Sequence, residues 1–285
     1  MTNGIVKSAL RIDAHQHFWR YSKALYSWID SSMEILKRDY LPVDLKPVLE
    51  KHQMNGSLAV QARASDEENS FLLELRKDHP FILGIVGWLD FCAPSLSAQL
   101  ERLNSYSAIK GYRAMVQDMP SPSDFLESDA FNKGVKLLQD TSKVYELLIH
   151  EADLPAAVSF CRRHDRAPIV LCHLGKPDVK NGNPSFWEKI LKNLASLSHV
   201  SVKISGIVTE AEWGKWTTSL LLPYLERTLQ FFGPERILFG SDWPVCLLSA
   251  KTGEVYSLAS KLAEILSTAE KELFWGKNAE RIYCL

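Results

Sequence analysis

Short apolar or β-branched runs recur along the chain, and a longer amphipathic stretch follows most of them. The runs lie at residues 10–15, 57–61, 82–90, 108–113, 144–150, 168–173, 200–205 and 236–242. Their nearly continuous apolar character is typical of strands that are buried on both faces. Segments with helical spacing of apolar residues lie at 67–79, 95–104, 130–141, 154–164 and 186–196. Strands that alternate with helices of this length predict βαβ units and a parallel sheet.

The number of these units favours a closed barrel. Eight strand–helix units in 285 residues average about 36 residues each, the repeat expected of a (β/α)8 barrel. The alternative, a doubly wound open sheet, would be favoured by a G-x-G-x-x-G loop after the first strand, and that motif is missing there. We therefore expect an α/β fold, a single (β/α)8 TIM barrel over residues 10–285 with an N-terminal extension at 1–9. The aromatic-rich segment 18–47 is expected to form a loop over the barrel mouth.

Charge and hydropathy exclude several kinds of partner. Lys and Arg number 33 and Asp and Glu 34, which gives a net charge of −1. A dedicated nucleic-acid or membrane-surface binder needs an excess of positive charge. The apolar run at 81–89 is far shorter than the ~20 residues of a membrane helix, and the first residues lack the apolar stretch of a signal peptide. We expect a cytoplasmic enzyme with a small-molecule substrate, no nucleic-acid partner and no membrane partner; a homo-oligomer is compatible with this sequence.

The cysteines indicate reduced thiols. Five cysteines are spread along the chain, an odd number with no C-x-x-C pair. A disulfide framework or a structural zinc knuckle is therefore not expected. Cys172 directly precedes His173, so that in a strand its side chain would point to the opposite face. We interpret it as a structural thiol.

Titratable side chains stand at the ends of most of the predicted strands. His15 and His17 are two residues apart, and in a strand such side chains point to the same side. His150, His173 and Asp242 end later runs. Alone, an H-x-H pair is equally consistent with a structural role, and an Asp after Gly-Ser with a helix cap. Barrel enzymes place their active sites at this end of the strands, so we predict that these residues converge on one centre.

Other residues are candidates for holding the substrate. Basic side chains inside apolar strand patterns can anchor a ligand, and the alternative is that they are surface charges. Tryptophans near strand ends can line a sugar pocket, although packing is their commoner role. The predicted substrate-binding residues are Arg113, Lys110, Lys203, Trp28, Trp243 and Trp88.

Four motifs resemble a known family. They are Asp-Ala-His-Gln-His-Phe-Trp at 13–19, His-Leu-Gly-Lys-Pro at 173–177, Lys-Ile-Ser-Gly at 203–206 and Gly-Ser-Asp-Trp-Pro at 240–244. Together they resemble the amidohydrolase-related branch of the amidohydrolase superfamily, and within it the sugar-lactonase group of L-fuconolactonases and L-rhamnonolactonases. The resemblance covers residues 10 to 283. It implies a barrel of the metal-dependent hydrolase type, a role in carbohydrate metabolism, and hydrolysis of the cyclic ester of a sugar acid.

Two positions depart from this family pattern. Many lactonase relatives have Asp where this chain has Cys172, and many have Arg or Tyr where it has His150. In the wider superfamily a fifth-strand His joins the first-strand H-x-H and the eighth-strand Asp in a mononuclear metal site. The resemblance therefore implies a metal set of His15, His17, His150 and Asp242. Lactonases of this particular branch are understood to work without an obligatory divalent ion, so both possibilities stay open.

Two mechanisms follow. In the first, Asp242 is the general base, held by His15, His17 and His173, while Arg113 polarises the lactone carbonyl and no metal is needed. In the second, the metal set binds one Zn²⁺ or Mn²⁺, which lowers the pKa of a bound water toward ~7, and His173 assists as acid or hydrogen-bond donor. In both, His15, His17, His173 and Asp242 are the catalytic residues.

Two other functions remain as alternatives. A metal-dependent decarboxylase of an aromatic or unsaturated carboxylate would use the same H-x-H pair, His150 and Asp242. A sugar-acid binding barrel without enzymatic activity is the third hypothesis. Turnover of a lactone separates the first function from both alternatives.

Overall fold

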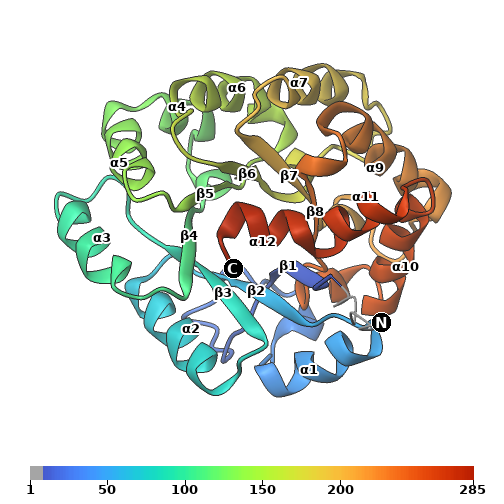
Figure 1. Ribbon diagram of the computed structural model, residues 1–285, viewed down its shortest axis with the longest axis horizontal. Helices are drawn as coiled ribbons and strands as arrows, with labels where there is room; N and C mark the ends of the chain where they lie inside the picture. The colour runs from blue at the N-terminus through green and yellow to red at the C-terminus, as the bar shows by residue number, and fades with distance from the viewer. Residues whose placement is uncertain (1–8) are drawn as a thin grey trace, which may run out of the picture.

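The computed structural model describes residues 9–285 and forms a closed parallel barrel. The strands are β1 (Ile12–Gln16), β2 (Gly56–Val60), β3 (Ile82–Trp88), β4 (Ile109–Ala114), β5 (Val144–Leu147), β6 (Ile169–Leu171), β7 (Val200–Ile204) and β8 (Ile237–Phe239). Each strand pairs in parallel with the next along the chain. A bridge between Gln16 and Trp243 joins β1 to the segment after β8 and closes the ring (Figure 1).

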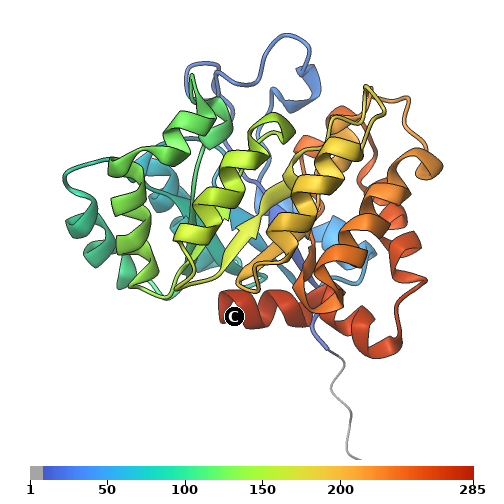
Figure 2. The ribbon, with the colours of Figure 1, turned by 90° about the horizontal axis from the view of Figure 1, so that it is seen from above.

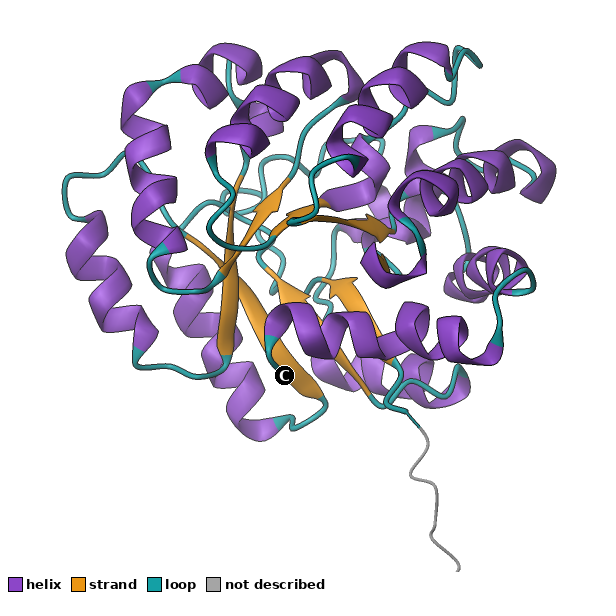
Figure 3. Ribbon diagram, turned by 45° about the horizontal axis from the view of Figure 1, so that its top comes forward, coloured by secondary structure: helices purple, strands orange, loops and turns teal. Residues whose placement is uncertain are grey.

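Helices surround the strands on the outside (Figure 3). They are α1 (Pro42–Lys51), α2 (Asp66–Asp78), α3 (Leu96–Asn104), α4 (Pro122–Glu127), α5 (Asp129–Gln139), α6 (Leu154–Arg163), α7 (Ser185–Ala195), α8 (Ile207–Glu210), α9 (Thr218–Phe232), α10 (Thr252–Ala263), α11 (Thr268–Glu272) and α12 (Asn278–Tyr283). Helix α2 illustrates how the local sequence specifies a helix. At its N-terminus, the Ser65 side chain accepts a hydrogen bond from the amide of Glu67. Acidic residues fill its first turn and basic residues its last, which suits the helix dipole.

The predicted (β/α)8 barrel is confirmed, and the open doubly wound sheet is not formed. All the predicted strands and helices are present, with boundaries displaced by one to three residues at most ends. The larger differences are at the carboxyl ends of β5, β6 and β8, which end before the predicted residues. The loop at 17–41 projects from one end of the barrel, and α12 lies across the opposite end (Figure 2). Residues 1–8 of the expected extension lie outside the described residues.

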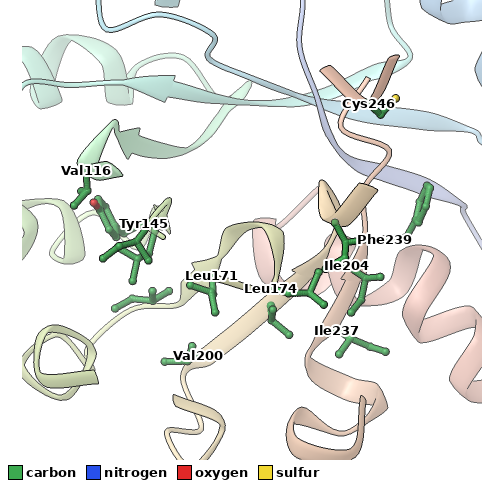
Figure 4. Close-up of a cluster of buried hydrophobic side chains, with 14 of the residues drawn as sticks. Val116, Tyr145, Leu171, Leu174, Val200, Ile204, Ile237, Phe239 and Cys246 are labelled. Atoms are coloured by element: carbon green, nitrogen blue, oxygen red, sulfur yellow. The ribbon is translucent and has the colours of Figure 1, made fainter. Parts of the chain in front are cut away.

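Strand side chains alternate between two apolar layers. In β6, Ile169 and Leu171 belong to the large cluster between the sheet and the helices, whereas Val170 belongs to a smaller cluster inside the barrel. Figure 4 shows part of the larger cluster, where Leu171 and Ile237 are among the labelled side chains. Within residues 9–285, no helix is long and apolar enough to cross a membrane.

Candidate active site

Three imidazoles and one carboxylate meet at the end of the barrel where the strands finish. His15 Nε2 lies 3.2 Å from His17 Nε2. Asp242 Oδ1 is 3.5 Å from His17 Nε2 and 3.8 Å from the Nε2 atoms of both His15 and His173. All four residues are at most 5% exposed. The structure therefore brings together the four residues that the sequence predicts to be catalytic.

Strained backbone places two of these groups. His173 and Asp242 both have positive φ, at 53° and 57°. Non-glycine residues adopt this region rarely, and they do so mainly where the surrounding structure imposes it, often at functional sites. His173 lies in a tight turn (Cys172–Gly175) with left-handed backbone, which follows β6 directly. The turn, and not strand alternation, directs its imidazole toward Asp242.

Hydrogen bonds fix the outer nitrogens of two rings. His17 Nδ1 is 2.8 Å from the carbonyl oxygen of Val60, which can only accept, so Nδ1 carries the proton. In a neutral ring this leaves the Nε2 lone pair of His17 facing the centre. His173 Nδ1 is 2.9 Å from Ser205 Oγ. Hydrogen bonds at Nδ1 thus hold the imidazoles of His17 and His173 in place, and their Nε2 atoms face Asp242.

Burial keeps the imidazoles of His15 and His173 neutral, and the neighbouring imidazoles keep the carboxyl of Asp242 ionised. Burial lowers the pKa of His15 well below its usual value and lowers the pKa of His173 to about 3. Burial alone would raise the pKa of Asp242, but its interactions with His173 and His17 outweigh that effect and lower the pKa. At neutral pH the centre therefore holds a carboxylate base beside the neutral rings of His15 and His173.

Arg113 supplies a buried positive charge beside this centre. Its guanidinium is 2% exposed, and Nη2 donates to the carbonyl oxygen of Gln61 at 2.6 Å. Its Nη1 is 3.5 Å from His15 Nε2, and its Nε has no hydrogen-bond partner among residues 9–285. A buried donor without a full set of partners is suited to bind the oxygen of a ligand.

A cavity of about 320 Å³ opens over the centre. His17, Arg113, His173 and Asp242 line it, and so does Trp28 from the loop after β1. The volume is at the small end of the range for small-molecule sites, roughly 300–1,000 Å³. The cavity therefore fits a compact substrate.

Sequence reasoning missed several further residues that line this cavity, among them Lys176, Glu210 and Trp213. Lys176 Nζ is 3.8 Å from Glu210 Oε1, and burial raises the pKa of Glu210. The signal was available, because Lys176 follows His173 within one motif and Glu210 follows the seventh predicted strand. These polar groups can bind the hydroxyls of a polar ligand.

Two predicted residues lie away from the centre. Lys110 is the second residue of β4 and donates to the carbonyl oxygen of Cys284 at 2.7 Å, at the end of the barrel that α12 covers. The prediction that Lys110 binds substrate is wrong, because this residue lies near the amino end of β4 and away from the cavity. His150 is exposed and lines a separate hollow beside Glu151 and Lys176. Since β5 ends at Leu147, His150 lies outside the barrel and does not complete the predicted metal set.

Two tryptophans also differ from the expectation. Trp243 is 3% exposed and packs edge-to-face against Tyr40, with ring centroids 5.2 Å apart. Trp88 ends β3, where its backbone is bonded to Asn69, and it is not among the residues that line the cavity. Of the three predicted tryptophans, Trp28 is the one in the cavity wall.

Lys203 and Cys172 lie inside the barrel beneath the centre. Lys203 is fully buried and pairs with Glu146, so it does not line the cavity. Cys172 Sγ donates to Glu146 Oε2 at 3.2 Å, so its side chain faces the barrel interior and not the opposite face. Burial raises the pKa of this thiol to about 12, which fits a structural role.

The donors at the centre fit a divalent metal ion. One ligand atom each from His15, His173 and Asp242 lies within 4.8 Å of the others, and His17 Nε2 is adjacent. Zinc is held in proteins by imidazole nitrogen and carboxylate oxygen, at about 2.0–2.2 Å. The structure therefore contains a His/Asp cluster of the type that binds a metal, built from His173 in place of the predicted His150.

A carboxylate base beside buried imidazoles, at the carboxyl end of a (β/α)8 barrel, is typical of a hydrolase centre. The chain belongs to the amidohydrolase family, whose sequence pattern matches residues 12–285. An L-fucono-1,5-lactonase of Burkholderia multivorans is 43% identical, over 97% of this chain and 97% of that protein. An L-fucono-1,5-lactonase of Burkholderia ambifaria is 30% identical, over 86% of this chain and 83% of that protein. These relatives confirm the resemblance to the sugar-lactonase group.

A solved structure agrees with the fold, and it contains zinc. A crystal structure of an amidohydrolase from Burkholderia multivorans with bound Zn is 44% identical, with a TM-score of 0.94 over 97% of this chain and 100% of that chain. The likeness to decarboxylases is distant. The 5-carboxyvanillate decarboxylase of Sphingomonas paucimobilis is 12% identical with a TM-score of 0.65, which shows a shared fold alone.

Proposed function

We propose that this protein hydrolyses the 1,5-lactone of a six-carbon deoxy sugar acid, with L-fucono-1,5-lactone as the preferred substrate. The protein is a hydrolase that acts on ester bonds. The observation that carries the proposal is the ionised Asp242, which faces three imidazoles at the base of a small cavity. The two lactonase relatives favour this substrate over other cyclic esters.

The chain's own residues supply each proton and each charge in the reaction. Asp242 accepts a proton from a water molecule, whose oxygen attacks the lactone carbonyl carbon. Arg113 stabilises the negative charge that develops on the carbonyl oxygen. When the ring C–O bond breaks, the leaving alkoxide takes this proton from Asp242, either directly or by way of His173 Nε2, so that Asp242 ends as the carboxylate. The products are an open-chain sugar acid and a regenerated carboxylate.

A divalent ion is compatible with this centre. His15, His173 and Asp242 would hold it, with His17 beside them. When bound, Zn²⁺ or Mn²⁺ supplies Lewis acidity and lowers the pKa of water. We propose that the ion is dispensable, because the carboxylate and Arg113 already provide a base and an electrophile for an activated ester.

A substrate panel tests the function. L-fucono-, L-rhamnono-, L-galactono- and D-sugar lactones are assayed by proton release, with and without exhaustive chelation. We expect the fastest turnover with L-fucono-1,5-lactone, retained at sub-stoichiometric metal. No hydrolysis across the panel overturns the proposal, and CO₂ release from aromatic carboxylates would favour the decarboxylase. Activity lost on chelation and restored by Zn²⁺ would show that the ion is required.

Asp242→Asn tests the role of the carboxylate. We expect kcat to fall by about 10²–10⁴, the usual contribution of a general base, with little change in the thermal midpoint. Asp90→Asn is the control, because it removes a carboxylate from an exposed turn. Wild-type turnover in Asp242→Asn would contradict both mechanisms.

We further propose that the protein works in the cytoplasm. All five of its cysteines are free in the structure, and three of them are buried. Thiols in this state suit a reducing compartment. Fractionation of the native host, with thiol titration of the recovered enzyme, tests this placement.

A further inference from the structure

A chain of buried polar groups lies inside the barrel, beneath the catalytic centre. It consists of Glu146 on β5, Lys203 on β7 and Tyr283 on α12, with exposures of 0%, 0% and 2%. Lys203 Nζ donates to Glu146 Oε1 at 2.5 Å, and the Tyr283 hydroxyl donates to the same oxygen at 2.5 Å. Cys172 Sγ donates to Glu146 Oε2 at 3.2 Å. The carboxylate is thus bonded on both oxygens.

This series of buried polar groups ends at a catalytic imidazole. Lys203 Nζ lies 3.3 Å from His15 Nδ1, the nitrogen that points away from Asp242. A buried ion pair adds little net stability, because desolvation of both charges offsets their attraction. A pair that is kept fully buried and directed at a catalytic ring therefore suggests a role in the site.

Donor and acceptor chemistry then favours one tautomer of His15. Two cationic donors flank this ring: Lys203 Nζ lies 3.3 Å from Nδ1, whereas Arg113 Nη1 lies 3.5 Å from Nε2, a weaker contact at the limit of hydrogen-bond distance. An ammonium group has three donors and no acceptor, so His15 Nδ1 must accept. A neutral imidazole carries a single N–H, which therefore sits on Nε2. That N–H faces His17 Nε2 at 3.2 Å, and His17 can accept because its own proton is on Nδ1, bonded to Val60. The hydrogen bonds from Glu146 to His17 form one consistent series.

We propose that Lys203 is a positioning residue, which fixes His15 as a hydrogen-bond donor toward His17 and Asp242. The proposal rests on the proposed function in one respect: the donor is useful because Asp242 is the base. Glu146 and Tyr283 hold Lys203 in place from the side of α12. A substitution of Glu146 or Tyr283, which do not line the cavity, can therefore alter catalysis.

The same contact weakens metal binding at His15. A nitrogen that carries a proton has no lone pair to offer a metal ion. Around this ring the cations Arg113 and Lys203 are matched by the carboxylates Glu146 and Asp242. A dication would add uncompensated positive charge to a buried site, where screening is weak. Lys203 thus favours the metal-free form of the centre.

The direct test is the protonation state of His15. ¹⁵N-histidine NMR of the wild-type protein, with His15→Gln to assign the signals, distinguishes a ring protonated at Nε2 from one protonated at Nδ1. We expect Nδ1 of His15 to be unprotonated in the wild type. A proton on Nδ1 overturns the proposal. This measurement requires no substrate, so it stands even if no lactone is hydrolysed and the proposed function fails.

The functional test removes the charge pair without leaving one buried charge alone. In the double variant Lys203→Met/Glu146→Gln, we expect kcat to fall by about 10-fold or more with KM within about 2-fold, and affinity for Zn²⁺ to rise by about 10-fold, magnitudes typical of outer-shell changes. Lys110→Met is the matched control, because that lysine lies at the opposite end of the barrel.

The outcomes separate a positioning role of the Lys203–Glu146 pair from a purely structural one. A double variant that folds, keeps wild-type kcat and binds Zn²⁺ as the wild type does would overturn the positioning role. If the double variant does not fold, Tyr283→Phe is used, since it removes one hydrogen bond from Glu146 and leaves the ion pair. We expect a smaller loss of kcat in the same direction, and an unchanged kcat there would count against the proposal.

Discussion

Gly206 and Gly240 make room for the imidazoles of the active site. A Cβ added at Gly206 would lie 2.4 Å from His173 Nδ1, and one at Gly240 would lie 2.6 Å from His15 Cβ. Gly206 also has a φ of 65°, which disfavours any side chain. We expect Gly206→Ala to displace His173 and to reduce kcat by at least about 10-fold, because misplacement of a catalytic group by about 1 Å can cost 10²-fold. Steady-state lactone hydrolysis measures the effect.

A matched control separates crowding from backbone strain. Gly182 has a similar φ of 68°, but an added Cβ there would meet nothing within 4 Å. Gly182→Ala should therefore lower stability by about 1 kcal/mol through strain and leave kcat unchanged. If both variants lost the same activity, displacement of His173 would not be the cause.

Trp28 is the aromatic side chain that the loop after β1 contributes to the cavity. Its Nε1 donates to the carbonyl oxygen of Ala62 at 3.0 Å, which holds the ring against the opening. We expect Trp28→Ala to raise KM for the lactone by about 10-fold with little change in kcat, because stacking on a sugar ring stabilises ground state and transition state alike. Trp28→Phe should recover part of the affinity. A drop in kcat without a change in KM would argue against a role in binding.

Residue identity predicted the centre, but position within a strand decided which residues reach it. Lys110 and Arg113 occupy the same apolar run, yet they lie three residues apart, about 10 Å along a strand. Arg113 is at the carboxyl end and reaches the cavity, whereas Lys110 is at the amino end and contacts the chain terminus. Glu146 was also visible as a charge inside an apolar run. Its partner Lys203 could not be inferred, because the two strands meet only in the folded barrel.

Helix α6 ends on a buried histidine whose ionisation should affect stability. His164 follows α6, is fully buried, and its Nε2 is 2.8 Å from Asn132 Oδ1 on α5. Burial lowers the pKa of His164 to about 4. In the unfolded chain a histidine takes up its proton near pH 6.5. As the pH falls from about 6.5 to about 4, the unfolded state therefore binds a proton that the folded state does not, and stability declines.

Urea unfolding at several pH values measures this linkage. We expect the free energy of unfolding of the wild type to fall more steeply between pH 6.5 and pH 4 than that of His164→Phe, which has no titrating group there. The variant loses the hydrogen bond to Asn132, so its stability at pH 7.5 is expected to be lower. Equal slopes for the two proteins would mean that His164 does not carry the effect.

Strand ends were the least predictable feature at the level of elements. The apolar pattern continues past β6 to His173, but the chain turns after Leu171, with positive φ at His173, Leu174 and Lys176. The position of His173 at a strand end therefore predicted correctly that it belongs to the centre, whereas alternation along a strand gave the wrong orientation for Cys172. Similarly, the apolar run after β5 extends to residue 149 although pairing stops at Leu147, and this carries His150 out of the barrel. Apolar character reports burial, and buried chain continues beyond the paired strands.

At the scale of the whole molecule, α12 closes the end of the barrel opposite the active site (Figure 2). Ile282 and Tyr283 join the apolar cluster inside the barrel, together with strand residues such as Leu58 and Val170. The last residues of the chain thereby pack against the first strands. Closure of the ring by the Gln16–Trp243 bridge and closure of its base by α12 both depend on contacts between distant parts of the sequence.

The packing of α12 against this end of the barrel contributes to stability, and its contribution can be measured apart from catalysis. Ile282 is 6% exposed, so Ile282→Ala removes buried methyl groups and leaves a cavity, which typically costs about 2–5 kcal/mol. The free energy of unfolding in urea should fall by that amount, while kcat of the folded fraction stays close to the wild type, because Ile282 contacts none of the catalytic groups. Ile265→Ala is the control: Ile265 is 62% exposed, and its truncation should change stability by less than about 0.5 kcal/mol. A loss of kcat in Ile282→Ala at full folding would instead show that packing of α12 is transmitted to the centre, through the Tyr283 bond to Glu146.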